Sequence, residues 1–247
     1  MSADLLFWLF ACLAVLIAGV SKGGFSGGPA MLATPVFALG SDPITAAAVM
    51  LPVLCFMDLL GLRAWWRYAD WQDIKLLVPS AVVGIIAGAF LFRSVETSVL
   101  LILLGVLALS FSGWQVTGGA KARHPKPWVG CLCGLVAGFS STMAHAGAPP
   151  LSVYLLSRKL SSKVYVGTAT VFFTATNGLK LIPYSFLDLL PKGNLIMSLA
   201  LMPIAWLGIQ LGIYLHHHIS QQVFFRVAYI ALAIVGVVLI YRGFLLF

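Results

Sequence analysis

Charged residues are scarce in this sequence, and their scarcity excludes a soluble protein. Asp, Glu, Lys and Arg make up only 9% of the 247 residues, whereas hydrophobic residues make up 61% and the mean hydropathy is +1.02. Soluble domains usually carry about 25% charged residues. Apolar runs of roughly 16 to 22 residues recur along almost the whole chain, which is the length that a helix needs to cross a bilayer at about 1.5 Å per residue. We therefore expect a membrane protein with no soluble domain.

Acidic residues are scarcer than basic ones: 7 Asp and Glu stand against 15 Lys and Arg, which gives a net charge of +8. A basic protein of this kind can bind nucleic acid, but here the basic residues lie between apolar runs instead of forming one cluster. At such places they set the orientation in the membrane and meet anionic lipid headgroups. We interpret the charge as topological, and we expect membrane lipids and no nucleic acid among the partners.

Cysteine is sparse as well, and all four cysteines lie inside apolar segments, which indicates packing rather than disulfides or a Cys-rich metal site. They are Cys12, Cys55, Cys131 and Cys133. The run at 216–218 is His-His-His, but it has no carboxylate or cysteine nearby, so we interpret it as interfacial. An ATP-binding motif is missing too, so any driving force must come from ion gradients or a separate subunit. We expect no metal and no other cofactor.

The apolar segments divide into two sets of five, with a hydrophilic stretch between them. In the first half they cover about 5–20, 28–40, 43–64, 73–92 and 96–116, and in the second half about 128–139, 147–157, 163–183, 195–215 and 222–243. We expect a first transmembrane repeat at 1–117, a cytoplasmic linker at 118–127 and a second transmembrane repeat at 128–247. The predicted fold class is an all-α polytopic membrane protein made of two repeats of about five helical elements each.

The two halves resemble each other in sequence as well as in hydropathy. At a constant offset of 119 residues, Cys12, Gly19, Ser21 and Gly28 correspond to Cys131, Gly138, Ser140 and Gly147. At an offset of 124 residues, Pro79, Gly84 and Gly88 correspond to Pro203, Gly208 and Gly212. Matches of Gly, Ser and Cys arise by chance less easily than matches of Leu in such a composition, so they support an internal duplication.

The distribution of Lys and Arg predicts an orientation, because cytoplasmic loops are enriched in them. With five elements per half, most of the basic residues fall on one side. That side receives Arg63, Arg67, Lys75, Lys121, Arg123, Lys126, Arg158, Lys159, Lys163 and Arg226. The other side receives only Arg93, Lys192 and Arg242. We therefore expect both termini in the periplasm, and an odd number of elements inverts the second repeat relative to the first.

The first two elements of each half are too short for two comfortable crossings of a hydrocarbon core about 30 Å thick. Each pair therefore predicts an interrupted hairpin whose tip lies inside the membrane, at 19–29 and at 138–150. Glycines in the first tip let a ligand approach the backbone closely. With inverted halves, helices beginning near Gly28 and Gly147 aim their positive ends at the midplane, and Lys22 adds a full charge there. Such a setting favours an anion.

One motif in the first tip is fairly specific: residues 19–28 read GVSKGGFSGG, a long apolar helix follows, and the arrangement is duplicated after about 120 residues. In these features the chain resembles the sulfite exporter TauE/SafE family over essentially its whole length. The resemblance implies a secondary transporter of sulfite, organosulfonates or related small anions in the bacterial inner membrane, often as export that accompanies sulfonate breakdown. The second tip, with SST at 140–142 and His145, departs from the motif. The sulfur in the expected substrate rests on this resemblance.

The candidate residues of the anion site belong to the two tips and to polar positions in later segments. They are Ser21, Lys22, Gly23, Gly24, Ser26, Gly27, Asp58, Ser140, Ser141, Thr142, His145, Asn177 and Lys180. We expect Lys22, tip amides and hydroxyl groups to hold a small oxyanion while the halves rock to give alternating access. The competing interpretations are a Lys22 that snorkels to the interface and glycines that serve tight helix packing.

The polar residues outside the first tip each leave two interpretations open. Asp58 lies at offset 119 from Asn177, so symmetry places both in one cavity, where Asp58 balances Lys22 or carries a proton; the alternative is a structural hydrogen bond between helices. Lys180 lies on the same helix face as Asn177 and is either a second anion contact or a snorkelling residue. His145 either bonds an oxyanion and titrates near neutral pH, or packs as a satisfied histidine.

Two other functions fit parts of the sequence. Residues 24–28 read GFSGG, which fits the Gly-x-Ser-x-Gly pattern, so Ser26 and His145 would be the nucleophile and base of an intramembrane serine hydrolase. No strand precedes this serine, as the soluble hydrolase elbow requires, so we favour a transporter over an enzyme. An anion channel would share the positive site. A coupling proton or Na⁺ and a homo-oligomer are compatible with the expected architecture.

Overall fold

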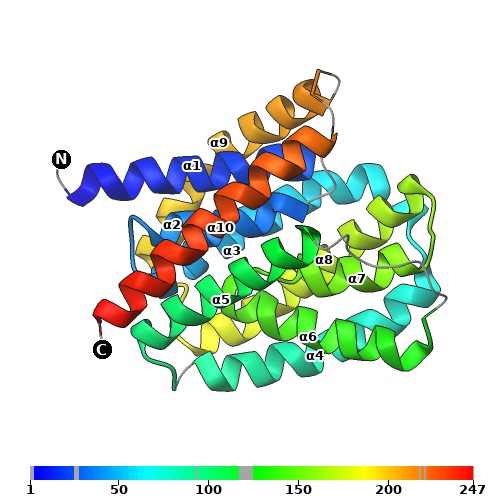
Figure 1. Cartoon of the computed structure of the whole chain (residues 1–247), viewed down its shortest axis with the longest axis horizontal. Helices are drawn as coiled ribbons and strands as arrows, with labels where there is room; N and C mark the ends of the chain where they lie inside the picture. Colours follow the sequence, from blue (N-terminus) through cyan, green and yellow to red (C-terminus); the bar gives the residue numbers. More distant parts are fainter. Residues whose placement is uncertain are drawn as a thin grey trace.

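The computed structural model describes residues 3–24, 28–92, 94–116, 125–216, 218–219 and 221–246. Within these ranges the chain is helical and contains no strand (Figure 1). The first half contains α1 (Ala3–Gly24), the 3-10 helix η1 (Gly28–Leu32), α2 (Ala33–Ala38), α3 (Pro43–Trp65), the 3-10 helix η2 (Trp66–Tyr68), α4 (Trp71–Phe92) and α5 (Thr97–Val116). The second half contains α6 (Pro127–Ala144), α7 (Ala148–Ser157), α8 (Ser162–Phe186), α9 (Lys192–His216) and α10 (Gln221–Leu245).

Seven of these helices are long and apolar enough to cross a membrane: α1, α3, α4, α5, α6, α9 and α10. The helix α8 is also long, but Thr, Asn and Lys side chains interrupt its apolar surface. The helices α2 and α7 are short, at 6 and 10 residues. The predicted fold class, an all-α polytopic membrane protein, is confirmed, and each predicted apolar element has a helical counterpart.

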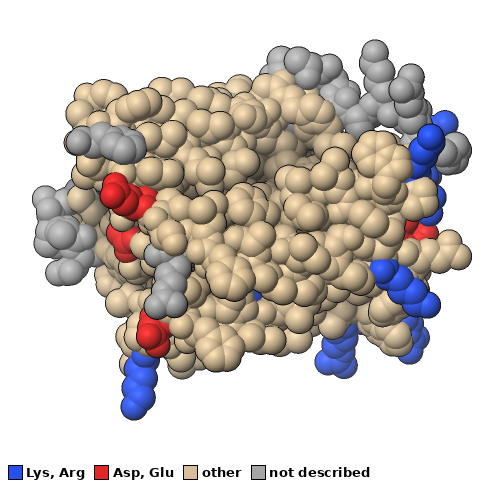
Figure 2. All heavy atoms as spheres, turned by 90° about the horizontal axis from the view of Figure 1, so that it is seen from below, with Lys and Arg blue, Asp and Glu red and all other residues tan. Residues whose placement is uncertain are grey.

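Both termini lie at the same end of the helix bundle (Figure 1), which we call the terminal end. On the face seen in Figure 2, most Lys and Arg side chains gather at the opposite end, which we call the basic end. The connections from α3 to α4 and from α7 to α8 lie at the basic end and carry Arg67 and Lys159. Because cytoplasmic loops are enriched in Lys and Arg, the basic end is the predicted cytoplasmic end.

The helices pack in pairs that each join one helix of the first half to one of the second, and glycines bring the backbones of these pairs close together. α1 packs along α9 and α4 along α6, while α5 packs on α10 and α3 on α8. A Cβ added at Gly138 would lie 2.1 Å from the carbonyl oxygen of Ala81, and one at Gly19 would lie 2.8 Å from that of Ala205. The offsets of 119 and 124 residues relate these two contacts to each other. Small residues suit such pairs because helices in lipid associate by close packing.

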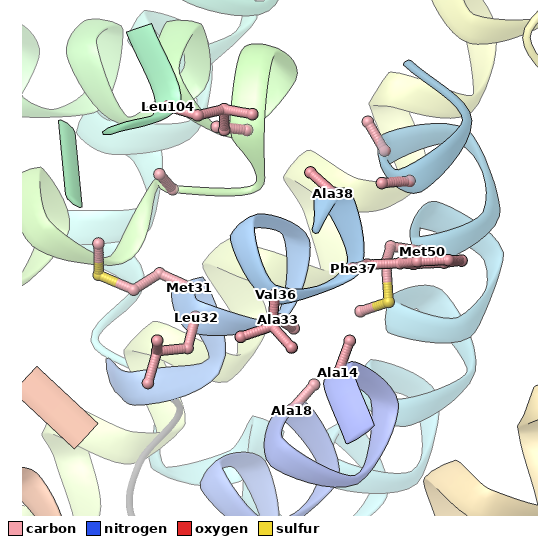
Figure 3. Close-up of a cluster of buried hydrophobic side chains, with 14 of the residues drawn as sticks. Ala14, Ala18, Met31, Leu32, Ala33, Val36, Phe37, Ala38, Met50 and Leu104 are labelled. Atoms are coloured by element: carbon pink, nitrogen blue, oxygen red, sulfur yellow. The ribbon is translucent and has the colours of Figure 1, made fainter. Parts of the chain in front are cut away.

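The short helix α2 lies in the core of the protein (Figure 3). All of its residues are buried. The surrounding cluster includes Ala14 and Ala18 of α1, and Phe37 of α2 lies beside Met50 of α3. A helix this short leaves polar backbone groups at its ends, and such groups are tolerated at membrane depth only where protein or water covers them. The enclosure of α2 therefore explains how a non-spanning element fits inside the bundle.

The two predicted tips are shorter than the sequence indicated. α1 continues to Gly24 and α6 continues to Ala144, so Lys22 and the SST run at 140–142 are helical rather than irregular. The helices continue because α1 and α6 are packed against α9 and α4, and this packing outweighs the low helix propensity of Gly and Ser. In the second tip the helix breaks at His145, whose backbone is left-handed with a φ of 52°.

The helices that follow the tips begin near the predicted positions but differ in detail. After the first tip the 3-10 helix η1 begins at Gly28, and the α-helix α2 continues from Ala33. After the second tip, α7 begins at Ala148 as expected, but the next residues, Pro149 and Pro150, have no backbone N–H. The positive end of α7 therefore offers fewer free amides to an anion than a helix start normally does.

Candidate functional site

Polar side chains from four helices meet deep inside the bundle. α1 supplies Lys22 in its last turn, α3 supplies Asp58, α8 supplies Asn177 and Lys180, and His145 caps the end of α6. At about 1.5 Å per residue, Asp58 lies about 22 Å from the start of α3 at the terminal end, and Asn177 lies about 22 Å from the start of α8 at the basic end. Along the same helices, Asp58 lies about 10 Å from the end of α3 and Asn177 about 13 Å from the end of α8, so the cluster lies inside the bundle and not at either end.

Lys22 and Asp58 form an ion pair that joins α1 to α3. The Lys22 ammonium donates a hydrogen bond to Oδ1 of Asp58 and lies 3.5 Å from the carbonyl oxygen of Leu54. The other carboxylate oxygen of Asp58 accepts a hydrogen bond of 2.6 Å from Nδ2 of Asn177. Both Asp58 and Asn177 are buried. Asp58 therefore both balances Lys22 and takes part in a hydrogen bond between α3 and α8, and Lys22 does not snorkel to an interface.

Lys180 is also turned inward, because its side chain is 0% exposed. Its ammonium donates to the carbonyl oxygen of Ser141 at 3.0 Å, to the hydroxyl of Ser141 at 2.9 Å and to Nδ1 of His145 at 2.8 Å. Three acceptors match the three N–H donors of an ammonium group. None of these acceptors is a carboxylate. Lys180 therefore has no ionic partner among its hydrogen-bond contacts.

The hydrogen bonds of His145 assign its tautomer. Nε2 lies 2.9 Å from the carbonyl oxygen of Ala47, which only accepts, so Nε2 carries the proton. Nδ1 faces the ammonium of Lys180 and therefore accepts. Both nitrogens of the imidazole are therefore engaged. This arrangement fits the interpretation of His145 as a satisfied packing residue.

A cavity of about 340 Å³ adjoins the ion pair. Its polar wall includes Lys22 and Asp58, and its apolar wall includes aromatic side chains of α3, α8 and α9. The aromatic residues are Trp65, Phe173 and Trp206. The wall extends toward the basic end, because Trp65 is the last residue of α3 there. A volume of this size falls within the range of small-molecule sites, about 300 to 1,000 Å³.

The candidate residues divide into those that line this cavity and those that do not. The lining set is Lys22, Gly23, Asp58, Ser141, His145 and Asn177. Buried behind the wall are Ser21, Ser140, Thr142 and Lys180. Gly24 ends α1, whereas Ser26 and Gly27 lie outside the described ranges. Gly23 also serves packing, because a Cβ there would lie 2.2 Å from the carbonyl oxygen of Ile209.

Two hydroxyl groups that we expected to face an anion are used inside the protein. The Ser140 hydroxyl donates to carbonyl oxygens, with Val136 at 2.8 Å and Ala146 at 2.9 Å as its nearest acceptors. The Thr142 hydroxyl donates to the carbonyl oxygen of Gly138 at 2.9 Å. Such bonds are typical of Ser and Thr inside helices. Within the described part of the chain, Ser141 is the tip serine that both lines the cavity and contacts Lys180.

Sequence reasoning missed two cavity residues of α9, Trp206 and Gln210. They lie one helical turn apart and therefore on the same face. Gln210 is a polar residue inside an apolar run, which is a signal of function in a spanning segment. The signal was present, but which face of α9 turns inward depends on how α9 packs against α1.

A second polar cluster ties the two halves together at the basic end. Nε of Arg158, at the end of α7, lies 3.2 Å from Oδ2 of Asp73 in α4, and Nη2 of Arg158 lies 3.7 Å from Oδ2 of Asp70. The Tyr154 hydroxyl donates to Oδ1 of Asp73 at 2.9 Å. Asp73 is 3% exposed. These contacts anchor α7 to the start of α4, away from the central cavity.

Residues 11–239 match the family described as Sulfite exporter TauE/SafE. The matched range includes both tips and all of the residues that line the cavity. Comparisons with curated proteins and with solved structures gave no significant match. A multi-pass location in the bacterial inner membrane fits this family and the seven apolar helices. Because the match covers nearly the whole chain, the protein belongs to the sulfite exporter TauE/SafE family of membrane transporters.

Proposed function

We propose that the protein exports small anions, such as sulfite or organosulfonates, through the site at Lys22. The observation that carries this proposal is the charge of the central cluster. Lys22 and Lys180 supply two ammonium groups, whereas Asp58 is the one carboxylate in hydrogen-bond contact with either of them in the described part of the chain. An anion with one negative charge would neutralise the positive charge that Asp58 leaves unbalanced. Buried charge is costly in a membrane, so such an excess of cations favours an anionic ligand.

The ion pair with Asp58 gives the empty site an internal substitute for the anion. Removing one partner of a buried pair leaves an uncompensated charge, which is expensive. In the empty site Asp58 neutralises Lys22, and an incoming anion competes with Asp58 for the same ammonium group. Asn177 holds the far oxygen of Asp58, so the carboxylate keeps one hydrogen bond when Lys22 leaves it. The site therefore has a stable arrangement both with and without substrate.

The walls of the cavity support a substrate that combines a charged head with a small apolar part. Lys22 and Ser141 provide donors at one side, while Phe173, Trp206 and Ile209 provide apolar surface at the other. Sulfite needs only the polar side. An organosulfonate would use both sides, with its sulfonate at Lys22 and its organic group against the aromatic rings. The sulfur in this proposal comes from the family, whose description names sulfite.

We also propose that the chain consists of two inverted repeats, 1–117 and 128–247, which rock to give alternating access. The pairing of α1 with α9 and of α6 with α4 supports this arrangement, because exchanging the repeats turns one pair into the other. The cavity extends toward the basic end, which is the predicted cytoplasmic end. An exporter loads its substrate from this side. The linker at 118–127 then lies in the cytoplasm.

The two alternative functions receive no support from a specific contact. A hydrolase needs a base with a free nitrogen, whereas both ring nitrogens of His145 are engaged by Ala47 and Lys180. A channel needs a continuous path with weak binding. The described cavity extends toward the basic end, and the fully buried Lys180 and Tyr184 lie toward the terminal end of α8. These contacts therefore favour a transporter over a hydrolase or a channel.

The binding step can be tested with purified protein in detergent. Sulfite and methanesulfonate are titrated into the wild type, Lys22→Gln and Lys75→Gln, and affinity is read by calorimetry and by the rise in melting temperature. Hydrogen bonds to charged groups contribute about 1.5 to 3 kcal/mol, so Lys22→Gln should weaken binding by about tenfold to a hundredfold. Lys75 is exposed on α4, so Lys75→Gln is a control that removes the same charge elsewhere. Wild-type affinity in a folded Lys22→Gln protein would rule out the proposed site.

A further inference from the structure

In each half of the protein, one lysine side chain bridges two equivalent helices, α1 and α3 in the first half and α6 and α8 in the second. The lysine belongs to α1 in the first half but to α8 in the second. In the first half Lys22 extends from the end of α1 to α3, where it meets Asp58. In the second half Lys180 extends from α8 to the end of α6, where it meets Ser141. The offset of 119 residues relates Lys22 to Ser141, so the two ammonium groups lie beside equivalent positions of the repeats.

The two lysines differ in their access to the cavity. Lys22 lines the cavity, and so does Gly61 on α3. The offset of 119 residues relates Gly61 to Lys180, and a glycine at this position has no side chain to fill the cavity. In the second half the long side chain of Lys180 occupies the corresponding position and is 0% exposed. The first half therefore holds an open lysine site, and the second half holds a closed one.

A buried tyrosine follows the closed lysine on α8, toward the terminal end. Tyr184 lies one helical turn beyond Lys180 on α8 and is fully buried. Its hydroxyl donates a hydrogen bond of 2.9 Å to the carbonyl oxygen of Thr142. The equivalent of Tyr184 in the first half is Trp65, which lines the open cavity at its basic end. An aromatic residue therefore stands beside both sites, bonded to the opposite helix only at the closed one.

We propose that Lys180 and Ser141 form a second anion site, which opens toward the terminal end when the two repeats exchange their conformations. The anion then binds Lys22 when the cavity faces the basic end and Lys180 when it faces the terminal end. This inference rests on the proposed transport function and adds that the anion changes lysines on its way across. The neutral partners of Lys180 fit this role, because an anion can approach the ammonium group without separating an ion pair. Opening requires that Tyr184 release Thr142.

The sidedness of the two lysines can be measured by acetylation. Right-side-out and inside-out membrane vesicles that contain the full chain are treated with sulfonated N-hydroxysuccinimide acetate, which does not cross the bilayer. Peptide mass spectrometry then gives the acetylated fraction of each lysine. Lys192 and Lys163 are exposed at the terminal end and the basic end, so they report which side the reagent reached.

We expect Lys180 to be acetylated in the same vesicles as Lys192, and Lys22 in the same vesicles as Lys163. The Tyr184→Phe variant removes the hydrogen bond to Thr142, which is worth about a twofold to tenfold change in an equilibrium. Acetylation of Lys180 from the terminal side should therefore rise by about that factor in the variant.

Acetylation of Lys180 from the basic side, together with Lys163, would show that both lysines share one cavity and would overturn the proposal. So would a Lys180 that remains unmodified from both sides in the wild type and in Tyr184→Phe. These readouts need no bound anion. A failure of the proposed anion transport would appear in the binding titrations, whereas the labelling pattern would still report whether Lys180 opens to the terminal end.

Discussion

Asp58 and Asn177 are hydrogen-bonded to each other across α3 and α8, with Nδ2 of Asn177 2.6 Å from Oδ2 of Asp58. The two residues are 119 positions apart, which is the offset that relates the two halves of the sequence. Equivalent residues of two repeats touch each other only near the axis that relates the repeats. The contact therefore supports an axis that passes through the polar cluster, where one repeat contributes a carboxylate and the other an amide.

Replacing Asp58 by Asn should tighten anion binding. The carboxylate competes with the anion for Lys22, and removing it leaves a partly buried ammonium group that only a ligand can neutralise. We expect the affinity for methanesulfonate to rise about tenfold, since a hydrogen bond to a charged group contributes about 1.5 to 3 kcal/mol. Calorimetric titration measures this change. Asp188→Asn is the matched control, because Asp188 is exposed and its φ of 53° is one that Asn tolerates. Unchanged or weaker binding by Asp58→Asn would contradict the role of Asp58.

Replacing Asn177 by Asp should make anion binding depend on pH. The new carboxylate lies beside Asp58, and two carboxylates that share a site resist ionising together, so the pair takes up a proton as the pH falls. When both are ionised they cancel the two lysines, and the anion loses its attraction. Methanesulfonate keeps its charge over this range, so its affinity for Asn177→Asp should fall as the pH rises. Asn194→Asp at the start of α9 is the control. If the affinity of Asn177→Asp for methanesulfonate depended on pH as little as that of the wild type, the proposed balance of charges between the lysines and the carboxylates would be wrong.

The contact between α4 and α6 should not accept a methyl group. A Cβ at Gly138 would lie 2.1 Å from the carbonyl oxygen of Ala81, and a backbone atom cannot move aside without shifting the helix. Gly138→Ala should therefore lower the free energy of unfolding by about 1 to 3 kcal/mol. Gly113→Ala is the control, because a Cβ there has nothing within 4 Å and Ala favours helix by about 1 kcal/mol. Thermal unfolding in detergent should show a lower melting temperature for Gly138→Ala and a higher one for Gly113→Ala. Equal shifts in the two variants would mean that α4 and α6 do not approach so closely.

The cluster at Asp73 should stabilise the attachment of α7. Asp73 is buried and bonds both Arg158 and Tyr154, so Asp73→Asn should destabilise the protein by about 1 to 3 kcal/mol. Asp70 is more exposed and lies 3.7 Å from Arg158, so Asp70→Asn should cost less than about 1 kcal/mol. The melting temperatures of the two variants test this order. A larger loss for Asp70→Asn would show that the cluster does not hold α7 through Asp73.

Much of the fold could be predicted from the sequence, because hydropathy in a membrane protein reports directly on helix length. The start of α3 at Pro43 and the end of α4 at Phe92 agree with the predicted elements. The backbone conformation of the two tips was harder to predict, because Gly and Ser by themselves favour irregular backbone. Lys22 is helical because α1 packs along α9, and this contact between distant segments leaves no local signal.

The candidate site could be predicted in part. The offset between the repeats indicated that Asp58 and Asn177 face one cavity, and both line it; the hydrogen bond between them was not predicted. The direction of Lys180 could not be predicted, because a lysine near the end of a helix can either snorkel outward or turn inward. Its direction is set by Ser141 and His145, which reach it from a different helix. The place of Gln210 in the cavity could not be predicted for the same reason, because it depends on how α9 packs against α1.

Anion flux into proteoliposomes tests the central claim most directly. Vesicles containing the wild type, Lys22→Gln or Lys75→Gln are given radiolabelled sulfite or methanesulfonate, and uptake is followed over a range of concentrations. We expect saturable uptake by the wild type and by Lys75→Gln, and an uptake at least about tenfold lower by Lys22→Gln, since losing a charged hydrogen bond costs about 1.5 to 3 kcal/mol. Equal uptake by the wild type and Lys22→Gln, or no uptake of either anion by the wild type, would contradict an anion transporter built around Lys22.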